Sequence, residues 1–295
     1  MDVLLLAELS LNGALVGLMY ALVALGIVVV YKASRYANLA QGAFCMTGGY
    51  ACVMLMVAAG MPIWAAAPAA IAIMFALGML VERFLLRRMI GQPVVMVIML
   101  TLGLEILLRG LVPGLMGSAV KRLDLGISQA PVLLGEILIN RAYLAGGGIA
   151  LLFIAGAVLF YNTALGVRMR AVSDDAVASW SIGIRVETMI ALAWGLAGSA
   201  AGAAGVLWGA VQGVDWTLSL LLLKAVAIAI LGGLDSVPGV LVAGILVGVI
   251  ESVAAGVLDP MVGGGTRDVV ASVIILLTVL IRPHGLFGRE HIERV

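Results

Sequence analysis

The chain has 295 residues, of which 63% are hydrophobic and 11% are charged, and its mean hydropathy is +1.20. These values exclude an ordinary soluble domain and indicate an integral membrane protein. The net charge of +1 gives no basis for a nucleic-acid partner. Cys45 and Cys52 are the only cysteines and share one apolar segment, so we expect neither a disulfide framework nor a metal site.

Apolar runs divide the chain into predicted membrane spans. A helix needs roughly 20 apolar residues to cross a bilayer core about 30 Å thick. We predict an all-α helix bundle with about nine transmembrane helices; eight or ten stay possible, because glycine-rich stretches can break and the last run is short. The first run follows a terminus without the basic region of a cleaved signal, so we expect it to be retained. The runs are 4–30, 39–59, 62–81, 93–112, 142–161, 189–211, 218–234, 237–258 and 269–281.

The distribution of lysine and arginine predicts the orientation of these spans, because cytoplasmic loops are enriched in both. The richer side carries Lys32, Arg35, Arg83, Arg87, Arg88, Arg168, Arg170, Arg185, Arg282, Arg289 and Arg294. The poorer side carries Arg109, Lys121, Arg122, Arg141 and Arg267. We therefore expect an outer amino terminus, an outer loop over 113–141, a cytoplasmic loop over 162–188 and a cytoplasmic carboxy terminus, all within one transmembrane domain, 1–295.

The loop 162–188 is the most informative segment, because it is a charged and helix-prone interruption of an apolar sequence. We predict a short surface helix over 176–180, which a soluble partner could bind. A helix that lies in the lipid headgroups is the alternative, although its mixed charge is atypical of such helices. The charged and turn-forming residues of the loop include Arg168, Arg170, Asp174, Asp175 and Gly183.

Glycines form side-chain-free faces on three predicted helices. Such faces let two helices approach closely in lipid, where apolar burial contributes little to association. Packing within the bundle is the first explanation, and a subunit interface is the alternative. The residues are Gly195, Gly198, Gly202, Gly205 and Gly209 in one helix, Gly13 and Gly17 in the first, and Gly244 and Gly248 in the eighth.

Four ionisable residues fall inside predicted spans: Glu105, Arg109, Lys224 and Glu251. Each needs a partner, water or the interface, because a charge at mid-bilayer costs roughly 2.5 to 3.5 kcal/mol. Glu105 and Arg109 are four residues apart, which favours a local ion pair. We expect Lys224 to extend outward to the interface. Glu251 lies deeper and is a candidate for lining a watery passage, with a partner helix as the alternative.

Two spans begin with a polar residue four positions before a glycine. The segments are Asn38-Leu-Ala-Gln41-Gly42 and Asp235-Ser-Val-Pro-Gly239. An N-cap explains the pattern, and a diverged internal repeat with a broken, pore-lining helix is the alternative.

Several enzyme motifs are missing from the sequence. No lysine follows a glycine as a phosphate-binding loop requires, no HExxH metal motif occurs, and no nucleophile elbow is complete. We therefore expect no catalytic residue, no cofactor and no metal.

The chain resembles the permease subunits of bacterial ABC importers for branched-chain amino acids, of the LivH type. The matching segments are Asn12-Gly13, Tyr20-Ala-Leu-Val-Ala-Leu-Gly26, Asn38 to Gly42, Gly48-Gly-Tyr50, Gly166-Val-Arg-Met-Arg-Ala171 through Asp174 to Gly183-Ile184, Lys224-Ala, Leu231-Gly-Gly-Leu234 and Arg282-Pro-His-Gly-Leu-Phe-Gly288. Gln41 departs from the family pattern.

The resemblance implies a heterodimer with a second permease, two cytoplasmic ATPases that hydrolyse ATP, and a periplasmic binding protein, in the inner membrane. It also implies that the segment with Arg168, Arg170, Ala171, Asp174, Asp175 and Gly183 is the coupling helix that docks on an ATPase. Urea, short amides and small aromatic acids are alternative cargoes. A self-contained ion-coupled carrier is a rival reading, although such a carrier would hold more acidic residues or histidines in its spans. A membrane scaffold is a third, which leaves the charged loop unexplained.

Overall fold

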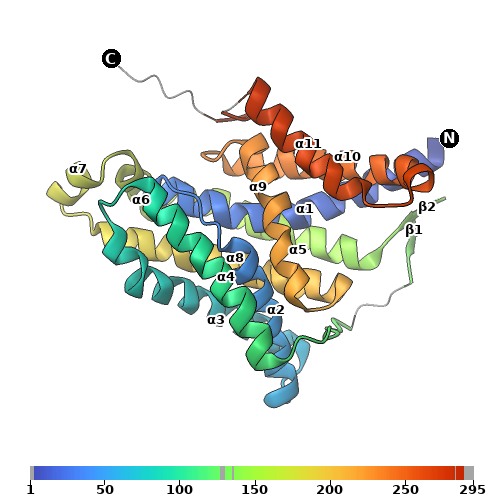
Figure 1. The fold of residues 1–295 in the computed structure, drawn as a ribbon, viewed down its shortest axis with the longest axis horizontal. Helices are drawn as coiled ribbons and strands as arrows, with labels where there is room; N and C mark the ends of the chain where they lie inside the picture. The colour runs from blue at the N-terminus through green and yellow to red at the C-terminus, as the bar shows by residue number, and fades with distance from the viewer. Residues whose placement is uncertain (1–2, 127–129, 135, 283, 289–295) are drawn as a thin grey trace.

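The computed structural model describes residues 3–126, 130–134, 136–282 and 284–288, so Arg289 and Arg294 lie outside the described residues. The described part is almost entirely helical (Figure 1). Its helices are α1 (Val3–Ser34), α2 (Gln41–Ala58), α3 (Ile63–Phe84), α4 (Val94–Met116), α5 (Arg141–Tyr161), α6 (Ala164–Asp174), α7 (Ala176–Ser181), α8 (Val186–Gln212), α9 (Leu221–Gly232), α10 (Val237–Val262) and α11 (Thr266–Ile281). Two 3-10 turns, η1 (Leu86–Met89) and η2 (Trp216–Leu220), and a hairpin of β1 (Val132–Leu134) and β2 (Ile137–Ile139) complete the fold.

The predicted all-α membrane bundle is confirmed, and each predicted run corresponds to a helix. Seven helices of the described chain are long and apolar enough to cross a membrane: α1, α2, α3, α4, α5, α8 and α10. The segment Trp216–Gly232, which joins η2 to α9, is apolar but shorter. At 16 residues α11 is also shorter than a full span requires. The number of complete crossings is therefore at least seven by length, and the predicted count of nine includes two short helices.

Several predicted helix ends were too early, and two of these errors involve proline. We expected the fourth span to end before Pro113, but α4 continues through Pro113 to Met116 and stops at Gly117, whose φ is +91°. Likewise α10 runs through Pro260 to Val262 and ends at Gly263. A proline removes one helical hydrogen bond but need not end a helix, whereas a glycine with positive φ does.

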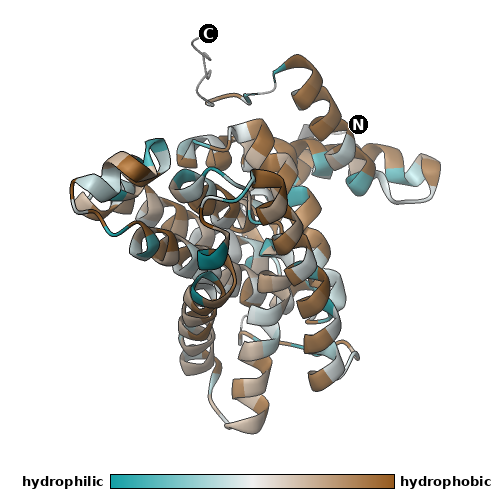
Figure 2. Cartoon of the chain, turned by 60° about the vertical axis from the view of Figure 1, so that its left-hand side comes forward, coloured by the Kyte–Doolittle hydropathy of each residue, from teal (hydrophilic) through white to brown (hydrophobic). Residues whose placement is uncertain are grey.

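The bundle is built around α1 and α8, which are the most enclosed helices. In their most apolar windows 78% of α1 and 83% of α8 is buried, against 22% of α4. Hydrophobic colour covers most of the helices on their outer sides in Figure 2, as expected where lipid replaces water. Figure 1 places α6 and α7 at one end of the molecule and the amino terminus with the hairpin at the other.

Glycine faces provide the closest helix contacts of the core. A Cβ atom on Gly13 would lie 2.6 Å from the carbonyl oxygen of Gly248, and one on Gly244 would lie 2.7 Å from that of Gly17. The two glycine pairs that the sequence shows in α1 and α10 therefore pack on each other. No larger residue fits at these crossings without moving the backbone.

The glycine face of α8 is also filled by this chain itself. A Cβ atom on Gly205 would lie 2.7 Å from Gly49 N in α2, and one on Gly198 would lie 3.0 Å from the carbonyl carbon of Met74 in α3. Gly202 lies against Gly48 of α2. Of the two explanations for this face, packing within the bundle is the one that the structure shows.

Candidate functional site

The loop 162–188 forms two short helices that project from the bundle. Thr163 caps α6 by accepting a hydrogen bond from Gly166 N at 3.4 Å. Asp175 caps α7 by accepting one from Ala178 N at 2.9 Å. Gly183, with φ of +87°, turns the chain back toward α8, and its N–H bonds Trp180 O at 3.0 Å. The predicted short helix and its ending at Gly183 are confirmed.

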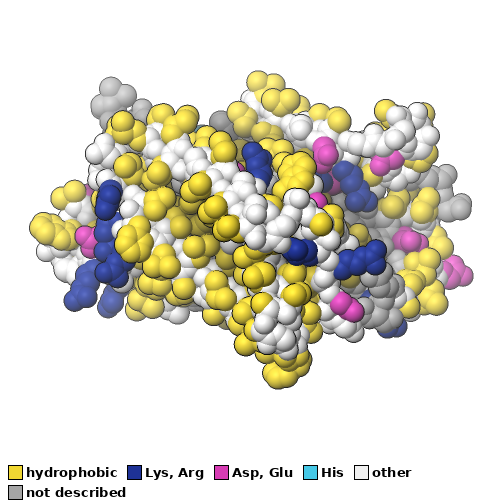
Figure 3. Space-filling model, turned by 60° about the horizontal axis from the view of Figure 1, so that its bottom comes forward, with side chains coloured by type: hydrophobic (Ala, Val, Ile, Leu, Met, Phe, Trp, Pro, Cys, Tyr) yellow, Lys and Arg dark blue, Asp and Glu magenta, His cyan; other side chains and the backbone are white. Residues whose placement is uncertain are grey.

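The two helices expose an apolar tip to solvent. Met169 and Val172 of α6 are buried against the bundle, whereas Val177, Trp180 and Ile182 are 77%, 74% and 75% exposed. Beside this tip, Arg168, Gly183 and Arg185 help to line a cavity of about 440 Å³. Lysine and arginine side chains gather at the same end of the molecule in Figure 3. An exposed tryptophan among aliphatic residues on a cationic surface is typical of a protein contact.

Two of the predicted coupling residues, Arg170 and Asp174, bond through their side chains to segments outside the loop 162–188. Arg170 donates from Nη1 to Tyr161 O at 2.7 Å, at the carboxyl end of α5, where a cation complements the helix dipole. Asp174 forms an ion pair with Arg35 at 2.9 Å. Ala171 lies within α6, and its carbonyl accepts from Asp175 N.

A cluster of polar side chains lies within the membrane-spanning part. Lys224 of α9 forms an ion pair with Glu251 of α10, and its Nζ also lies 3.1 Å from Tyr20 Oη of α1 and 3.5 Å from Asp268 Oδ1. Tyr20 stacks on Trp208 of α8 at 4.7 Å between ring centroids. Lys224 therefore has a buried carboxylate partner on a neighbouring helix and also lies near the exposed carboxylate of Asp268, and its extension to the interface stays a prediction.

Glu251 was expected either to line a watery passage or to contact a partner helix, and one of its carboxylate oxygens makes the second kind of contact. Oε1 bonds Lys224 and Tyr20, whereas Oε2 is buried and has no hydrogen-bond partner among the described residues. No polar or charge pattern in the sequence indicates Tyr20, which belongs to a segment that resembles the family. Opposite charges on two consecutive helices, α9 and α10, are the signal that could have predicted the pair.

The expected Glu105–Arg109 ion pair is wrong. Glu105 Oε2 instead accepts from Ala43 N of α2 at 2.7 Å, and no ion pair with Arg109 occurs in the described chain. The first turn of α2 has free N–H groups, and a carboxylate there satisfies one and complements the helix dipole. A contact between helices distant in sequence thus replaces a local one.

At the start of α2, buried polar side chains are linked by hydrogen bonds, and they do not form a simple helix cap. Asn38 donates to Gln41 Oε1 at 3.0 Å, and Gln41 donates to Ala197 O of α8 at 3.1 Å; both residues are fully buried. Gly42 packs against Ser219 of η2. Asn38 is not the helix N-cap, because α2 begins at Gln41 after Ala40. For the second segment the cap is Ser236, which accepts from Gly239 N, and not Asp235.

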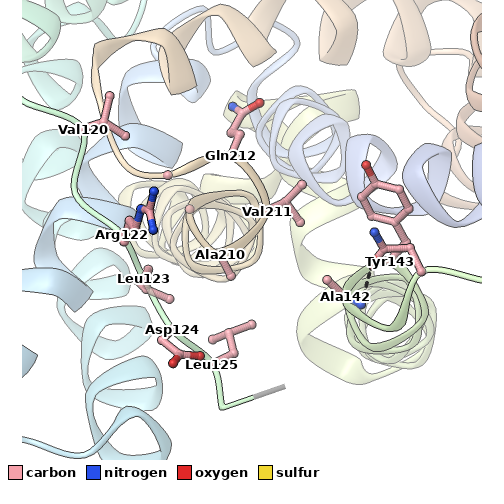
Figure 4. A pocket seen from close by; sticks show the side chains of 13 residues that line it. Val120, Arg122, Leu123, Asp124, Leu125, Ala142, Tyr143, Ala210, Val211 and Gln212 are labelled. Atoms are coloured by element: carbon pink, nitrogen blue, oxygen red, sulfur yellow. Dashed lines mark hydrogen bonds between the residues drawn. The ribbon is translucent and has the colours of Figure 1, made fainter. Parts of the chain in front are cut away.

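A larger cavity of about 730 Å³ lies at the opposite end of the molecule from α7. It lies between the segment 120–125, the first turn of α5 and the end of α8, as Figure 4 shows. Arg122 and Asp124 line it from the segment, and Tyr143 lines it from α5. A pair of backbone hydrogen bonds between Lys121 and Val214, at 3.0 and 2.8 Å, fixes the segment on α8.

This architecture of apolar helices defines a polytopic membrane protein. The family model for the permease component of branched-chain amino acid transport systems matches residues 9–281, so the chain belongs to that family of ABC transporter permeases.

Similar curated proteins span nearly the whole chain. The high-affinity branched-chain amino acid transport permease BraD of Pseudomonas aeruginosa is 30% identical over 96% of both chains. LivH of Salmonella typhimurium is 27% identical over 96% of both, and a probable LivH of Methanocaldococcus jannaschii is 27% identical over 95% of this chain and 92% of its own. Among solved structures, PsaBC from Streptococcus pneumoniae in complex with Fab has a TM-score of 0.49 and 13% identity, covering 92% of this chain and 91% of that chain.

Proposed function

We propose that this chain forms half of the translocation pore of an ATP-driven importer for branched-chain aliphatic amino acids. The family and the names of its relatives support this cargo over urea, short amides or aromatic acids. The other half of the pore is a second permease subunit. Two cytoplasmic ATPases bind and hydrolyse the ATP, and this chain contributes no catalytic, metal or cofactor site of its own. It works by alternating access, in which the two ends of the pore open in turn.

The observation that carries the proposal is the exposed apolar tip on α7. Val177, Trp180 and Ile182 are held outward by a capped helix between two turns, within the loop that the charge distribution assigns to the cytoplasm. We propose that this tip enters a groove of an ATPase, which makes 162–188 the coupling segment of a single permease domain. The amino terminus is then outside and the carboxy terminus cytoplasmic, in the bacterial inner membrane.

We also propose a role for the cavity of about 730 Å³ that Arg122, Asp124 and Tyr143 line. It lies on the side assigned to the periplasm, where a binding protein delivers the amino acid. Arg122 and Asp124 offer opposite charges there. Such charges orient an incoming protein and raise its rate of association more than its affinity.

The substitution Trp180→Ala tests the coupling segment in the reconstituted importer. We expect the ATPases to bind roughly thirtyfold more weakly or worse, because a central buried tryptophan typically contributes 2 kcal/mol or more to an interface. Trp64→Ala is the matched control, since Trp64 is similarly exposed, at 77%, and lies in the first turn of α3, outside the loop 162–188. Equal ATPase binding by both variants and the wild type would overturn the proposal. Transport by this chain alone, without ATPases, would favour a secondary carrier.

A further inference from the structure

Arg35 has an unusual backbone conformation at the end of α1. Its φ is +62°, and no other non-glycine residue of the described chain has a positive φ. L-residues with a side chain disfavour this region, and such strain persists only where the surroundings hold it in place. The conformation turns the Arg35 side chain away from the helix axis and into contact with two other segments.

The Arg35 guanidinium joins the coupling segment to the turn between α9 and α10. Nη1 lies 3.1 Å from both carboxylate oxygens of Asp235, and Nη2 lies 2.9 Å from Asp174 Oδ1. Nε donates to Ser173 O at 3.3 Å. The planar guanidinium can make these bonds at once, which a lysine ammonium cannot do with the same geometry.

The α9–α10 turn that Arg35 holds is itself fixed on two sides. Lys32 of α1 donates to Asp235 O at 2.9 Å. The carboxy-terminal segment packs on the other side, where Leu286 N donates to Leu231 O at 2.7 Å and Phe287 N to Gly232 O at 3.3 Å. The segments 231–234 and 282–288, which the sequence shows as separate motifs, thus meet at this turn.

The same two helices connect this turn to the polar cluster in the membrane. Arg35 and Tyr20 both belong to the α1 region and are 15 positions apart, which is roughly 22 Å along a helix. Asp235 immediately precedes α10, which carries Glu251. Because Gly13 and Gly17 pack on Gly248 and Gly244 backbone to backbone, α1 and α10 form one stiff pair.

We propose that Arg35 is a positioning residue that transmits movement of the coupling segment to the α1–α10 pair. When the ATPase displaces α6 and α7, the ion pair with Asp174 carries the displacement to α1, and the pair with Asp235 carries it to α10. The two helices, which carry Tyr20 and Glu251, then move together relative to Lys224 of α9. The inference rests on the proposed function, because it assumes that α6 and α7 are moved by an ATPase.

The test uses the complete importer, with both permeases, the ATPases and the binding protein, in liposomes. In Arg35→Asn the side chain tolerates a positive φ but has no charge, so the backbone turn can be kept while both ion pairs are lost. We expect normal assembly and basal ATP hydrolysis but at least about fivefold fewer amino acids imported per ATP, the lower range of a typical coupling between sites. Arg88→Asn is the matched control, because Arg88 is an exposed arginine of η1 and none of the ion pairs among the described residues includes it.

Two further variants keep the inference testable if Arg35→Asn fails to assemble. Asp174 has a 65% exposed side chain, so Asp174→Asn should fold; we expect it to reduce the import per ATP in the same way, and Asp174→Glu to retain it. The double variant Arg35→Asn/Asp174→Asn should lose no more than Arg35→Asn alone, because both changes break the same contact.

An unchanged import ratio in Arg35→Asn and Asp174→Asn, or additive losses, would overturn the role of Arg35. If Trp180→Ala still weakened ATPase binding in that case, the proposed function would stand; if it did not, both would fail.

Discussion

The α1–α10 crossing and the α6–α7 segment are held in place by different forces. At the crossing, four glycines bring two backbones together, and the contact cannot change without separating the helices. At α6 and α7, two caps, one ion pair and the buried side chains of Met169 and Val172 hold helices whose apolar tip is exposed. The first arrangement resists deformation, whereas the second can be repositioned at small cost. An importer driven from outside its own chain needs both, because force applied at an adjustable end has to reach a part that does not bend.

The largest expected effect is at the glycine crossing. In Gly244→Leu the new side chain has no space, since a Cβ atom alone would lie 2.6 Å from Ala21 Cβ. We expect destabilisation of about 3 kcal/mol or more, as for severe overpacking, and little folded protein on size-exclusion chromatography. Gly103→Leu in α4 is the control, because a Cβ atom on Gly103 meets nothing within 4 Å. Equal yields of the two variants would show that the crossing is not rigid.

A smaller effect is expected at the buried ion pair. Glu251→Gln leaves the Lys224 ammonium buried without its main counter-charge, which typically costs about 3 kcal/mol. Thermal unfolding in detergent should show the loss, and Lys224→Met in the same chain should restore part of it. Asp268→Asn is the control, because Asp268 is 86% exposed and lies 3.5 Å from Lys224. A loss as large in Asp268→Asn would mean that the outer carboxylate, and not Glu251, stabilises the lysine.

The smallest effect is expected at the α7 cap, within the adjustable region. Asp175→Ala removes the acceptor for Ala178 N and should cost the helix about 1 kcal/mol. Hydrogen exchange of α7 should become faster while that of α1 and α10 stays unchanged, because the segment is loosely joined to the core. Asp175→Asn retains the acceptor and should behave like the wild type. Faster exchange throughout α1 would contradict the separation between the two regions.

The sequence predicted the membrane class, the position of each apolar helix and the short helix after Asp175, but not α6, because these predictions depend on hydropathy, spacing and local capping. It could not predict which helices meet. Lys224 pairs with Glu251 of the next helix, and Glu105, which was expected to pair with Arg109, instead bonds the backbone of α2. One sequence shows that a charge within a membrane span needs a partner, but it does not show which residue of which helix supplies that partner.

The composition, the spans and the family motifs of this protein follow from its sequence alone. Only the tertiary structure decided that the glycines of α1 lie on those of α10, that the motif at 231–234 contacts the one at 282–288, and that Arg35 joins Asp174 to Asp235. The physical reason is that hydropathy and capping act within one helix, whereas close packing and ion pairing depend on where distant helices cross.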